Sequence, residues 1–195
     1  MDRNGGNSGK SSGPAPSEVL CHYWHPVARS SEVTDKPFKA KLLNRPLVLW
    51  QSERRVAAFY DLCIHRGTPL SLGWVDNGEL VCAYHGWRYA ASGSCTRIPS
   101  LPPDRSIPEK ARAKAFNTKE RYGLIWVCLD ELQHEIPEFP PEYNDPSFRW
   151  EGFETDGMWK ANAARMIENL ADYSHFPFVH PGTLGDPENT QSEPI

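Results

Sequence analysis

Two short segments of the chain each offer one thiol and one imidazole. Cys63 and His65 are separated by one residue, Cys82 and His85 by two, and sixteen residues lie between the two pairs. Thiolates and imidazoles bind zinc or the iron of iron-sulfur clusters. A zinc finger takes paired cysteines from one side and paired histidines from the other, whereas each segment here provides one of each. The pattern favours a 2Fe-2S cluster with two cysteines on one iron and two histidines on the other, and a structural zinc site is the alternative.

A second group of polar side chains stands nearer the C-terminal end of the chain. Asn169, Asp172, His175 and His180 form the pattern N-x-x-D-x-x-H-x-x-x-x-H. Two histidines and a carboxylate with open coordination positions make up the facial triad of non-heme Fe(II) oxygenases. Alternatively, both histidines are ordinary residues, one near a helix C-terminus, where positive charge is favourable, and one in a loop. These residues by themselves leave both interpretations open.

Short apolar segments of strand length precede and follow the thiol-imidazole pairs. We predict strands at residues 39–43, 46–51, 56–62, 79–81, 87–90 and 122–129. Residues 97–114 contain several prolines and are predicted to be irregular. The spacing indicates a mainly β protein with some α structure, in which a small β-barrel or sandwich occupies residues 18–135.

The rest of the chain has a different pattern. Residues 1–17, rich in Gly and Ser, are predicted to be a flexible tail, and four prolines within residues 136–147 predict a stiff connector. We expect a strand at residues 148–158 and then a helix at residues 160–174. The helix is predicted from apolar residues at i, i+3, i+4 and i+7, which are Ala163, Met166, Ile167 and Leu170.

The predicted helix would place several polar residues on a second stripe. Glu168, Asp172 and His175 stand at i, i+4 and i+7. The helix should end near His175, because Pro177 disfavours helical geometry in Phe176.

Composition excludes several classes of protein. The net charge is -4 with no basic block, so a nucleic-acid partner is not expected. The longest apolar run, residues 124–129, is far shorter than the ~18 residues that suggest a membrane span. We find no export signal, so we expect a cytoplasmic protein whose five cysteines are metal ligands or plain thiols rather than disulfides.

The first motif resembles a known kind of domain. C-x-H, sixteen residues and C-x-x-H, with Gly67 after the first pair and Gly86-Trp87 after the second, is similar to the Rieske domain. Respiratory-chain Rieske proteins add a disulfide between the two loops, and those positions here are Thr68 and Tyr84. The sequence therefore resembles the lower-potential centres of oxygenases and their ferredoxins. The resemblance implies a Rieske-type fold whose 2Fe-2S ligands are Cys63, His65, Cys82 and His85.

With the second motif, the chain resembles the N-terminal part of Rieske non-heme iron ring-hydroxylating oxygenase α subunits. The three-residue step from Asn169 to Asp172 is similar to the branch of phthalate oxygenase, vanillate O-demethylase and dicamba monooxygenase. The resemblance implies that residues 148–195 begin an α+β, helix-grip-like catalytic domain, in which His175 and His180 bind a mononuclear Fe(II). Asp172 would have the catalytic role of bridging His175 to a cluster histidine, His85, of the neighbouring subunit in a homotrimer.

The resemblance also implies a function. Electrons from NAD(P)H would reach the cluster through a partner reductase or ferredoxin and pass to the Fe(II). There O2 would be activated for hydroxylation or oxidative demethylation of a small organic, aromatic or related substrate. The alternative is a Rieske ferredoxin-type electron carrier, which has no need of the second motif.

One part of the family pattern is missing. The family's third iron ligand is a carboxylate far downstream of the two histidines, and Asp186, Glu188 and Glu193 lie instead in a loop-like sequence close to them. We therefore expect the chain to be incomplete, and we do not expect turnover from this portion alone.

Overall fold

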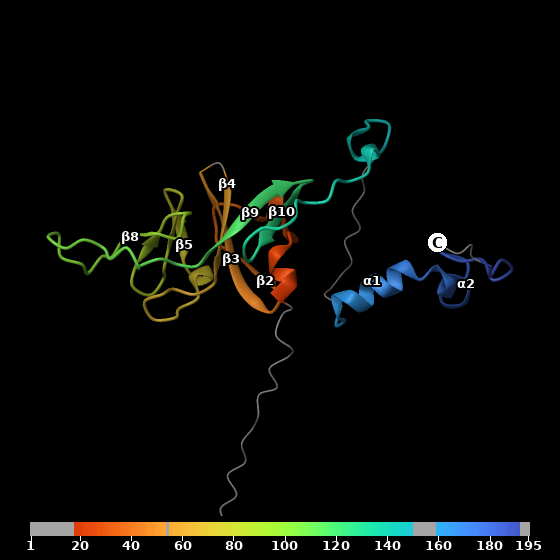
Figure 1. Cartoon of the computed structure of the whole chain (residues 1–195), viewed down its shortest axis with the longest axis horizontal. Coiled ribbons are helices and arrows are strands. Elements are labelled where there is room, and N and C mark those ends of the chain that lie inside the picture. Colours follow the sequence, from red (N-terminus) through yellow and green to blue (C-terminus); the bar gives the residue numbers. More distant parts are fainter. Residues whose placement is uncertain (1–17, 54, 150–158, 192–195) are drawn as a thin grey trace, which may run out of the picture. The chain divides into compact units, whose positions relative to one another are not determined.

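The computed structural model describes residues 18–53, 55–149 and 159–191 (Figure 1). They divide into two units, Met1–Glu138 and Phe139–Ile195, and the division falls within the proline-rich segment at residues 136–147. The predicted tail at residues 1–17 and most of the predicted strand at residues 148–158 lie outside the described residues.

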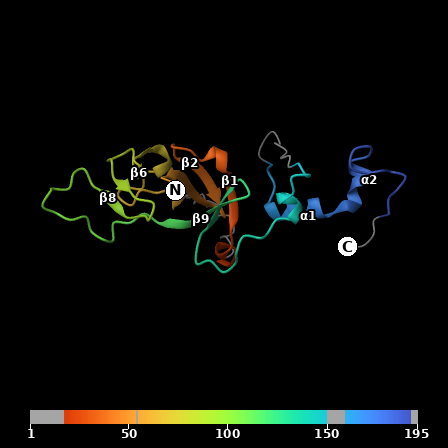
Figure 2. The ribbon, with the colours of Figure 1, turned by 90° about the horizontal axis from the view of Figure 1, so that it is seen from above.

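The first unit consists of two antiparallel sheets (Figures 1 and 2). The six-stranded sheet has the order β1-β10-β9-β4-β3-β2, and the four-stranded sheet has the order β5-β6-β7-β8. The larger sheet contains β1 His25–Arg29, β2 Phe38–Leu42, β3 Arg45–Ser52, β4 Arg55–Tyr60, β9 Ala115–Arg121 and β10 Leu124–Cys128. The smaller sheet contains β5 Trp74–Asp76, β6 Glu79–Val81, β7 Arg88–Tyr89 and β8 Cys95–Arg97. The 3-10 helices of this unit are η1 Glu18–His22, η2 Ser30–Glu32 and η3 Leu70–Leu72.

Strands β3 and β4 each contain a run of consecutive buried residues. Because successive side chains of a strand point to opposite sides, both faces of these strands are buried. One face contributes to a core between the two sheets, which includes Val48, Trp50, Phe59, Leu80 and Tyr89. The other face contributes to a second core, which includes Leu47, Leu49, Ala58, Ile125 and Val127. The two cores position β4 and β6, and the thiol-imidazole pairs follow these strands, Cys63 three residues after β4 and Cys82 immediately after β6.

The predicted fold class is confirmed, and the mainly β structure contains few helices. Each strand predicted within residues 39–129 corresponds to an observed one, but the prediction for residues 122–129 was wrong at its start. Tyr122 and Gly123 have φ of 59° and 69° and form the turn between β9 and β10, a conformation typical of tight hairpins. Residues 97–114 contain no regular element apart from the first residue, as predicted, and they project from the smaller sheet (Figures 1 and 2).

The second unit contains η4 Pro141–Asn144, α1 Ala163–Ala171, η5 Tyr173–His175 and α2 Phe176–Val179. Helix α1 ends earlier than predicted, so Asp172 does not lie on its surface stripe. The Asp172 side chain accepts hydrogen bonds from the amide and hydroxyl of Ser174 and begins η5 instead. The prediction for Phe176 was wrong, because this residue is helical although Pro177 follows it. Pro177 itself stands in the first turn of α2, where its missing N–H costs no hydrogen bond.

No helix among the described residues is long and apolar enough to cross a membrane.

Candidate metal sites

Both thiol-imidazole pairs lie in tight loops with the same backbone hydrogen bonds. In the first loop, after β4, the Cys63 amide donates to the Thr68 carbonyl at 2.8 Å, and the Gly67 amide donates to the Cys63 carbonyl at 2.9 Å. The second loop, after β6, repeats both bonds at 2.9 and 3.0 Å among Cys82, Trp87 and Gly86. Gly67 and Gly86 have φ of 74° and 67°, a region that favours glycine, so each loop requires the glycine of its motif.

The two loops bring like ligands together. Cys63 and Cys82 are 2% and 1% exposed, whereas His85 is exposed and His65 partly so. Burial, together with the neighbouring Cys63 thiol, raises the pKa of Cys82. The ring centroids of His65 and His85 lie 4.5 Å apart. The site is therefore a pair of thiols below the surface and a pair of imidazoles at the surface.

This arrangement fits a binuclear cluster better than a single zinc ion. Nδ1 of His65 is buried and has no hydrogen-bond partner, as expected of a ligating nitrogen. Partial burial of the ring, followed by the charges of His85 and Arg66, lowers the pKa of His65, which favours the neutral form that binds metal. Within the described part of the chain, no three His, Cys, Asp or Glu side chains converge on one point. Four ligands in two separate pairs suit two irons.

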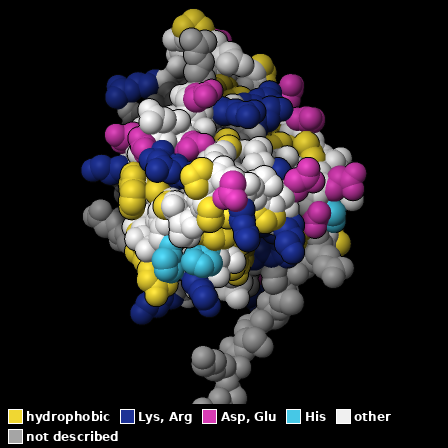
Figure 3. All heavy atoms as spheres, turned by 90° about the vertical axis from the view of Figure 1, so that its left-hand side faces the viewer, with side chains coloured by type: hydrophobic (Ala, Val, Ile, Leu, Met, Phe, Trp, Pro, Cys, Tyr) yellow, Lys and Arg dark blue, Asp and Glu magenta, His cyan; other side chains and the backbone are white. Residues whose placement is uncertain are grey.

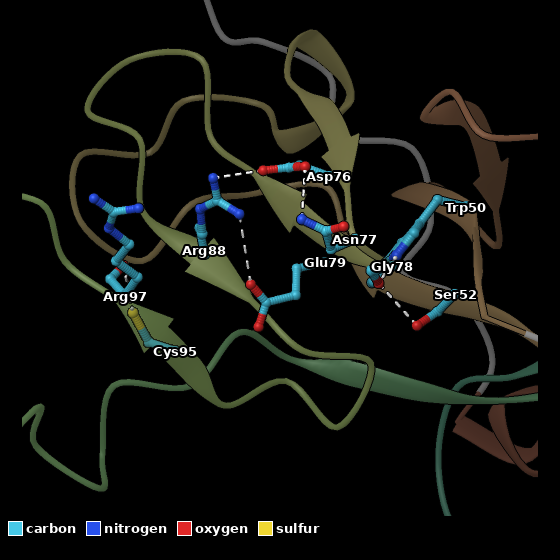
Figure 4. Close-up of polar contacts among 9 residues, drawn as sticks. All are labelled: Trp50, Ser52, Asp76, Asn77, Gly78, Glu79, Arg88, Cys95 and Arg97. Atoms are coloured by element: carbon cyan, nitrogen blue, oxygen red, sulfur yellow. Dashed lines mark hydrogen bonds and ion pairs between the residues drawn. The ribbon is translucent and has the colours of Figure 1, made fainter.

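Polar contacts fix the smaller sheet beside these loops (Figure 4). Arg88, three residues after His85, forms ion pairs with Asp76 at 2.6 Å and with Glu79 at 3.9 Å. The carbonyl of Gly78, at the tip of the β5-β6 hairpin, accepts bonds from two side chains of β3, Trp50 Nε1 at 3.2 Å and Ser52 Oγ at 2.8 Å. The second loop therefore follows the β5-β6 hairpin, which forms polar contacts with both sheets.

Asp61 fixes the first loop from inside. Its carboxylate is 5% exposed and accepts bonds from the Ser71 amide at 2.7 Å and from the Ser71 hydroxyl at 2.6 Å. Asp61 precedes Cys63 and Ser71 follows it, so this pair closes the loop that carries Cys63 and His65. Sequence reasoning did not identify Asp61, because a single carboxylate beside a strand gives no sign of its partner.

Tyr89 contacts one of the candidate ligand thiols directly. Its hydroxyl lies 3.2 Å from Cys63 Sγ, and both side chains are buried. Burial and the adjacent Cys63 raise the pKa of Tyr89 well above its usual value, so the phenol keeps its proton. A metal-bound thiolate can only accept a hydrogen bond, and Tyr89 would then be the donor. Sequence reasoning included Tyr89 only as a strand residue.

The second motif also comes together in space. His175 and His180 have ring centroids 5.4 Å apart, and His175 Nδ1 lies 3.6 Å from Asp172 Oδ2. Nε2 of His175 is buried without a hydrogen-bond partner, so this atom remains available to a metal. Hydrogen bonds from Ser174, followed by the nearby His175, lower the pKa of Asp172 and keep its carboxylate ionised. The group fits two imidazole ligands with a carboxylate orienting one of them.

The loop after His180 is held by hydrogen bonds to the carbonyl of His180. The carbonyl oxygen accepts bonds from the amides of Thr183, Leu184 and Gly185 at 3.2 to 3.3 Å. A Cβ atom on Gly185 would lie 2.2 Å from the carbonyl carbon of Phe176, so only glycine permits this contact. The loop thereby holds His180 against the turn that carries His175.

Two protein-family models match the chain. Residues 23–117 match the Rieske [2Fe-2S] domain, and residues 159–195 match the vanillate O-demethylase oxygenase C-terminal domain. The fold and its paired ligands therefore define a Rieske iron-sulfur protein. Because it joins this domain to the second one, the chain belongs to the Rieske non-heme iron oxygenases and corresponds to part of their α subunit.

Relatives of known structure support this assignment. The chain is 42% identical over 182 residues to methylxanthine N1-demethylase NdmA of Pseudomonas putida, covering 89% of this chain and 51% of that protein. The structure of NdmA with caffeine superposes with a TM-score of 0.79 at 41% identity, covering 90% of this chain and 53% of that one. Dicamba monooxygenase bound to dicamba gives a TM-score of 0.72 at 32% identity, covering 83% and 48%. The chain thus spans about half the length of these relatives.

Proposed function

We propose that the protein is the oxygenase component of a system that demethylates or hydroxylates a small aromatic or heteroaromatic molecule. Its electrons would come from NAD(P)H through a reductase or ferredoxin. The observation that carries the proposal is that one chain holds both the paired thiols and imidazoles of the first unit and the His175-Asp172 pair of the second. The five free cysteines support a reducing, cytoplasmic location.

The residues divide the work between two sites. Cys63, Cys82, His65 and His85 would hold the 2Fe-2S cluster, and His175 and His180 would hold the mononuclear Fe(II). When bound, the cluster stores and transfers single electrons, and the Fe(II) supplies open positions for O2. With the cluster bound, Tyr89 would donate its hydrogen bond to the Cys63 thiolate and so favour the reduced state.

Asp172 would connect the two sites between subunits. Its carboxylate faces His175 Nδ1 on its own chain and is half exposed, so it can accept a second hydrogen bond. The ring of His85, exposed at the cluster loop, is a suitable donor on a neighbouring subunit. We place this contact in a head-to-tail homotrimer, in which each carboxylate orients two imidazoles and shortens the path of the electron.

A Rieske ferredoxin-type carrier is less well supported. A carrier needs only the first unit, whereas residues 159–195 match an oxygenase domain and bring His175, His180 and Asp172 together. NdmA, a demethylase, is the relative that favours oxidative removal of a methyl group.

The test uses the full-length α subunit with a reductase, NADH and O2. Methylxanthines and methoxybenzoates serve as substrates, and formaldehyde and the demethylated product are measured. We expect one formaldehyde for each NADH consumed. Reduction of the cluster without substrate-dependent O2 uptake for any N-methyl, O-methyl or unsubstituted aromatic compound would instead identify a carrier.

Asp172→Asn provides the site-specific variant. We expect product formation to fall about 100-fold, since residues that orient metal ligands are worth roughly 10- to 100-fold, while the cluster still accepts electrons from dithionite. Asp186→Asn is the matched control, because Asp186 is exposed and its carboxylate accepts a hydrogen bond from the Glu188 amide of its own loop. Equal losses in both variants would remove Asp172 from the proposed pathway.

A further inference from the structure

An apolar groove lies directly beside the cluster loops. It has a volume of about 520 Å³ and is lined by Ile64, Trp87, Ile98, Leu101, Pro108 and Lys110, with Ala111. Only Lys110 brings a charge. Small-molecule sites combine an apolar lining with several convergent polar groups that orient the ligand, and this groove has only one. Its composition therefore suits the apolar side chain of a partner protein better than a substrate.

The floor of the groove contacts a cluster ligand. The Trp87 ring stacks on the His65 ring, with centroids 4.7 Å apart and planes inclined by 7°. Ile64 stands between the two ligands of the first loop, Cys63 and His65, and is 41% exposed. A molecule seated in the groove would touch residues that are bonded to, or stacked on, the ligands, with no intervening layer of protein.

Residues 97–114, the segment that supplies most of the groove lining, have a net positive charge. Residues 97–114 carry five basic and two acidic side chains, although the whole chain has a net charge of -4. Arg66, in the first cluster loop, adds an exposed guanidinium. On the face drawn in Figure 3, adjoining histidine side chains lie among hydrophobic, Lys and Arg side chains. Positive charge around an apolar centre is the complement of an acidic protein surface.

We propose that this groove is the docking site for an acidic iron-sulfur electron-donor protein, so that electrons enter through Trp87 and His65. An apolar side chain of the donor fills the groove, and its carboxylates face Lys110, Arg97 and Arg66. One electron leaves the donor, which is oxidised, and reduces the 2Fe-2S cluster, and no bond is made or broken. The proposal rests on the proposed function, because only a cluster that must be reduced by another protein needs a donor.

The test compares two reductants of the same cluster. A reduced plant-type 2Fe-2S ferredoxin, which is an acidic protein, is the docking probe, and dithionite is the small reductant that needs no docking. Cluster reduction is followed by stopped-flow absorbance in the full chain, and calorimetry measures the affinity for oxidised ferredoxin. Lys110→Glu reverses the charge at the rim, and Leu101→Asp puts a charge into the apolar lining. Lys41→Glu on β2, at an edge of the larger sheet, is the matched control.

We expect Lys110→Glu and Leu101→Asp each to lower the ferredoxin rate constant about tenfold at low salt and to weaken binding in parallel, with the Lys110 effect shrinking as salt is added. Dithionite rates should be the same in all variants, and Lys41→Glu should behave as the wild type. Wild-type ferredoxin rates in both groove variants, with normal dithionite reduction, would overturn the docking site and leave the proposed function standing.

Other occupants of the groove give different results. If Leu101→Asp changes the oligomeric state and leaves ferredoxin reduction unchanged, the groove belongs to a contact with a second copy of the chain and the proposal is wrong. An equal loss with Lys41→Glu would mean that overall charge, rather than this surface, governs the reaction. A wild-type chain with no dithionite-reducible cluster would contradict the proposed function itself, and the docking site with it.

Discussion

The contact between the Tyr89 hydroxyl and Cys63 is expected to influence the reduction potential of the cluster. Because a reduced cluster carries one more negative charge, a donor to its sulfur ligand stabilises the reduced form more than the oxidised form. Tyr89→Phe should therefore lower the reduction potential. A difference of ~1 kcal/mol corresponds to roughly 40 mV for a one-electron couple. Protein-film voltammetry measures the shift, and the variant should keep the wild-type iron content.

Tyr122→Phe is the control for this prediction. Tyr122 also carries a phenol in the same unit, but it lies in the turn between β9 and β10. The reduction potential of the Tyr122→Phe variant should equal that of the wild type. An unchanged potential in Tyr89→Phe would show that the 3.2 Å contact does not persist once the cluster is bound.

The buried carboxylate of Asp61 acts on the shape of the first loop. Asp61→Ala leaves the Ser71 amide and hydroxyl without their acceptor, and it should cost about 1–3 kcal/mol of unfolding free energy. Asp61→Asn keeps an acceptor for the amide and should recover most of this loss. Urea unfolding, followed through the visible absorbance of the cluster, measures both. Equal destabilisation by Ala and Asn would mean that charge, rather than hydrogen bonding, holds the loop.

The proposed ligands could be predicted from the sequence, whereas the residues that support them could not. Cys63, His65, Cys82 and His85 stand at short, regular spacings, and the fixed geometry of a cluster explains such spacings. Tyr89 is 26 residues from Cys63, and the packing of the two sheets around a shared core brings the two side chains together. Contacts of this kind depend on tertiary structure and leave no local pattern.

At the scale of the elements, the close approach of η3 to β6 requires a residue without a side chain at position 73. A Cβ atom on Gly73 would lie 1.9 Å from the Val81 carbonyl oxygen, one residue before Cys82. Gly73→Ala must push these segments apart, so we expect a loss of several kcal/mol, in the range of severe core mutations, and little cluster uptake. Gly123→Ala is the control, since nothing lies within 4 Å of its added Cβ, and it should cost only about 1 kcal/mol for its positive φ.

Thermal unfolding and iron content separate these two glycine variants. If Gly73→Ala takes up a full cluster with a stability close to that of Gly123→Ala, the approach of η3 to β6 is not needed for the site.

Element boundaries were the least predictable part of the fold. The apolar periodicity correctly predicted helix α1, but it contains no information about where the helix ends. The helix ends at Ala171, and the side chain of the next residue, Asp172, accepts a hydrogen bond from the Ser174 amide. Four strands, β1, β5, β8 and β9, had no prediction of their own. The strand β9 alternates in exposure, but its sequence is largely polar and gave no apolar signal.

At the scale of the whole molecule, the two units differ in what they can do alone. All four proposed cluster ligands and both hydrophobic cores lie within residues 18–138, where every core strand is paired with its neighbours. In the second unit, Ile167 and Leu170 of α1 are 67% and 65% exposed, and the described residues provide no third ligand beside His175 and His180. The order of the strands in the sheets, which makes the first unit self-sufficient, depends on long-range pairing that sequence periodicity does not contain.

This difference predicts how the protein binds iron. A chain ending at Glu138 and the chain of residues 1–195 should both hold about two irons after reconstitution and desalting, the content of a single 2Fe-2S cluster. Both should give the same Rieske electron paramagnetic resonance spectrum when reduced. Fe(II) added to residues 1–195 should be lost on desalting, because two imidazoles without a carboxylate ligand leave the facial triad incomplete. Cys82→Ser in the shorter chain should abolish the cluster signal, and a stable third iron in residues 1–195 would show that a further ligand lies within this chain.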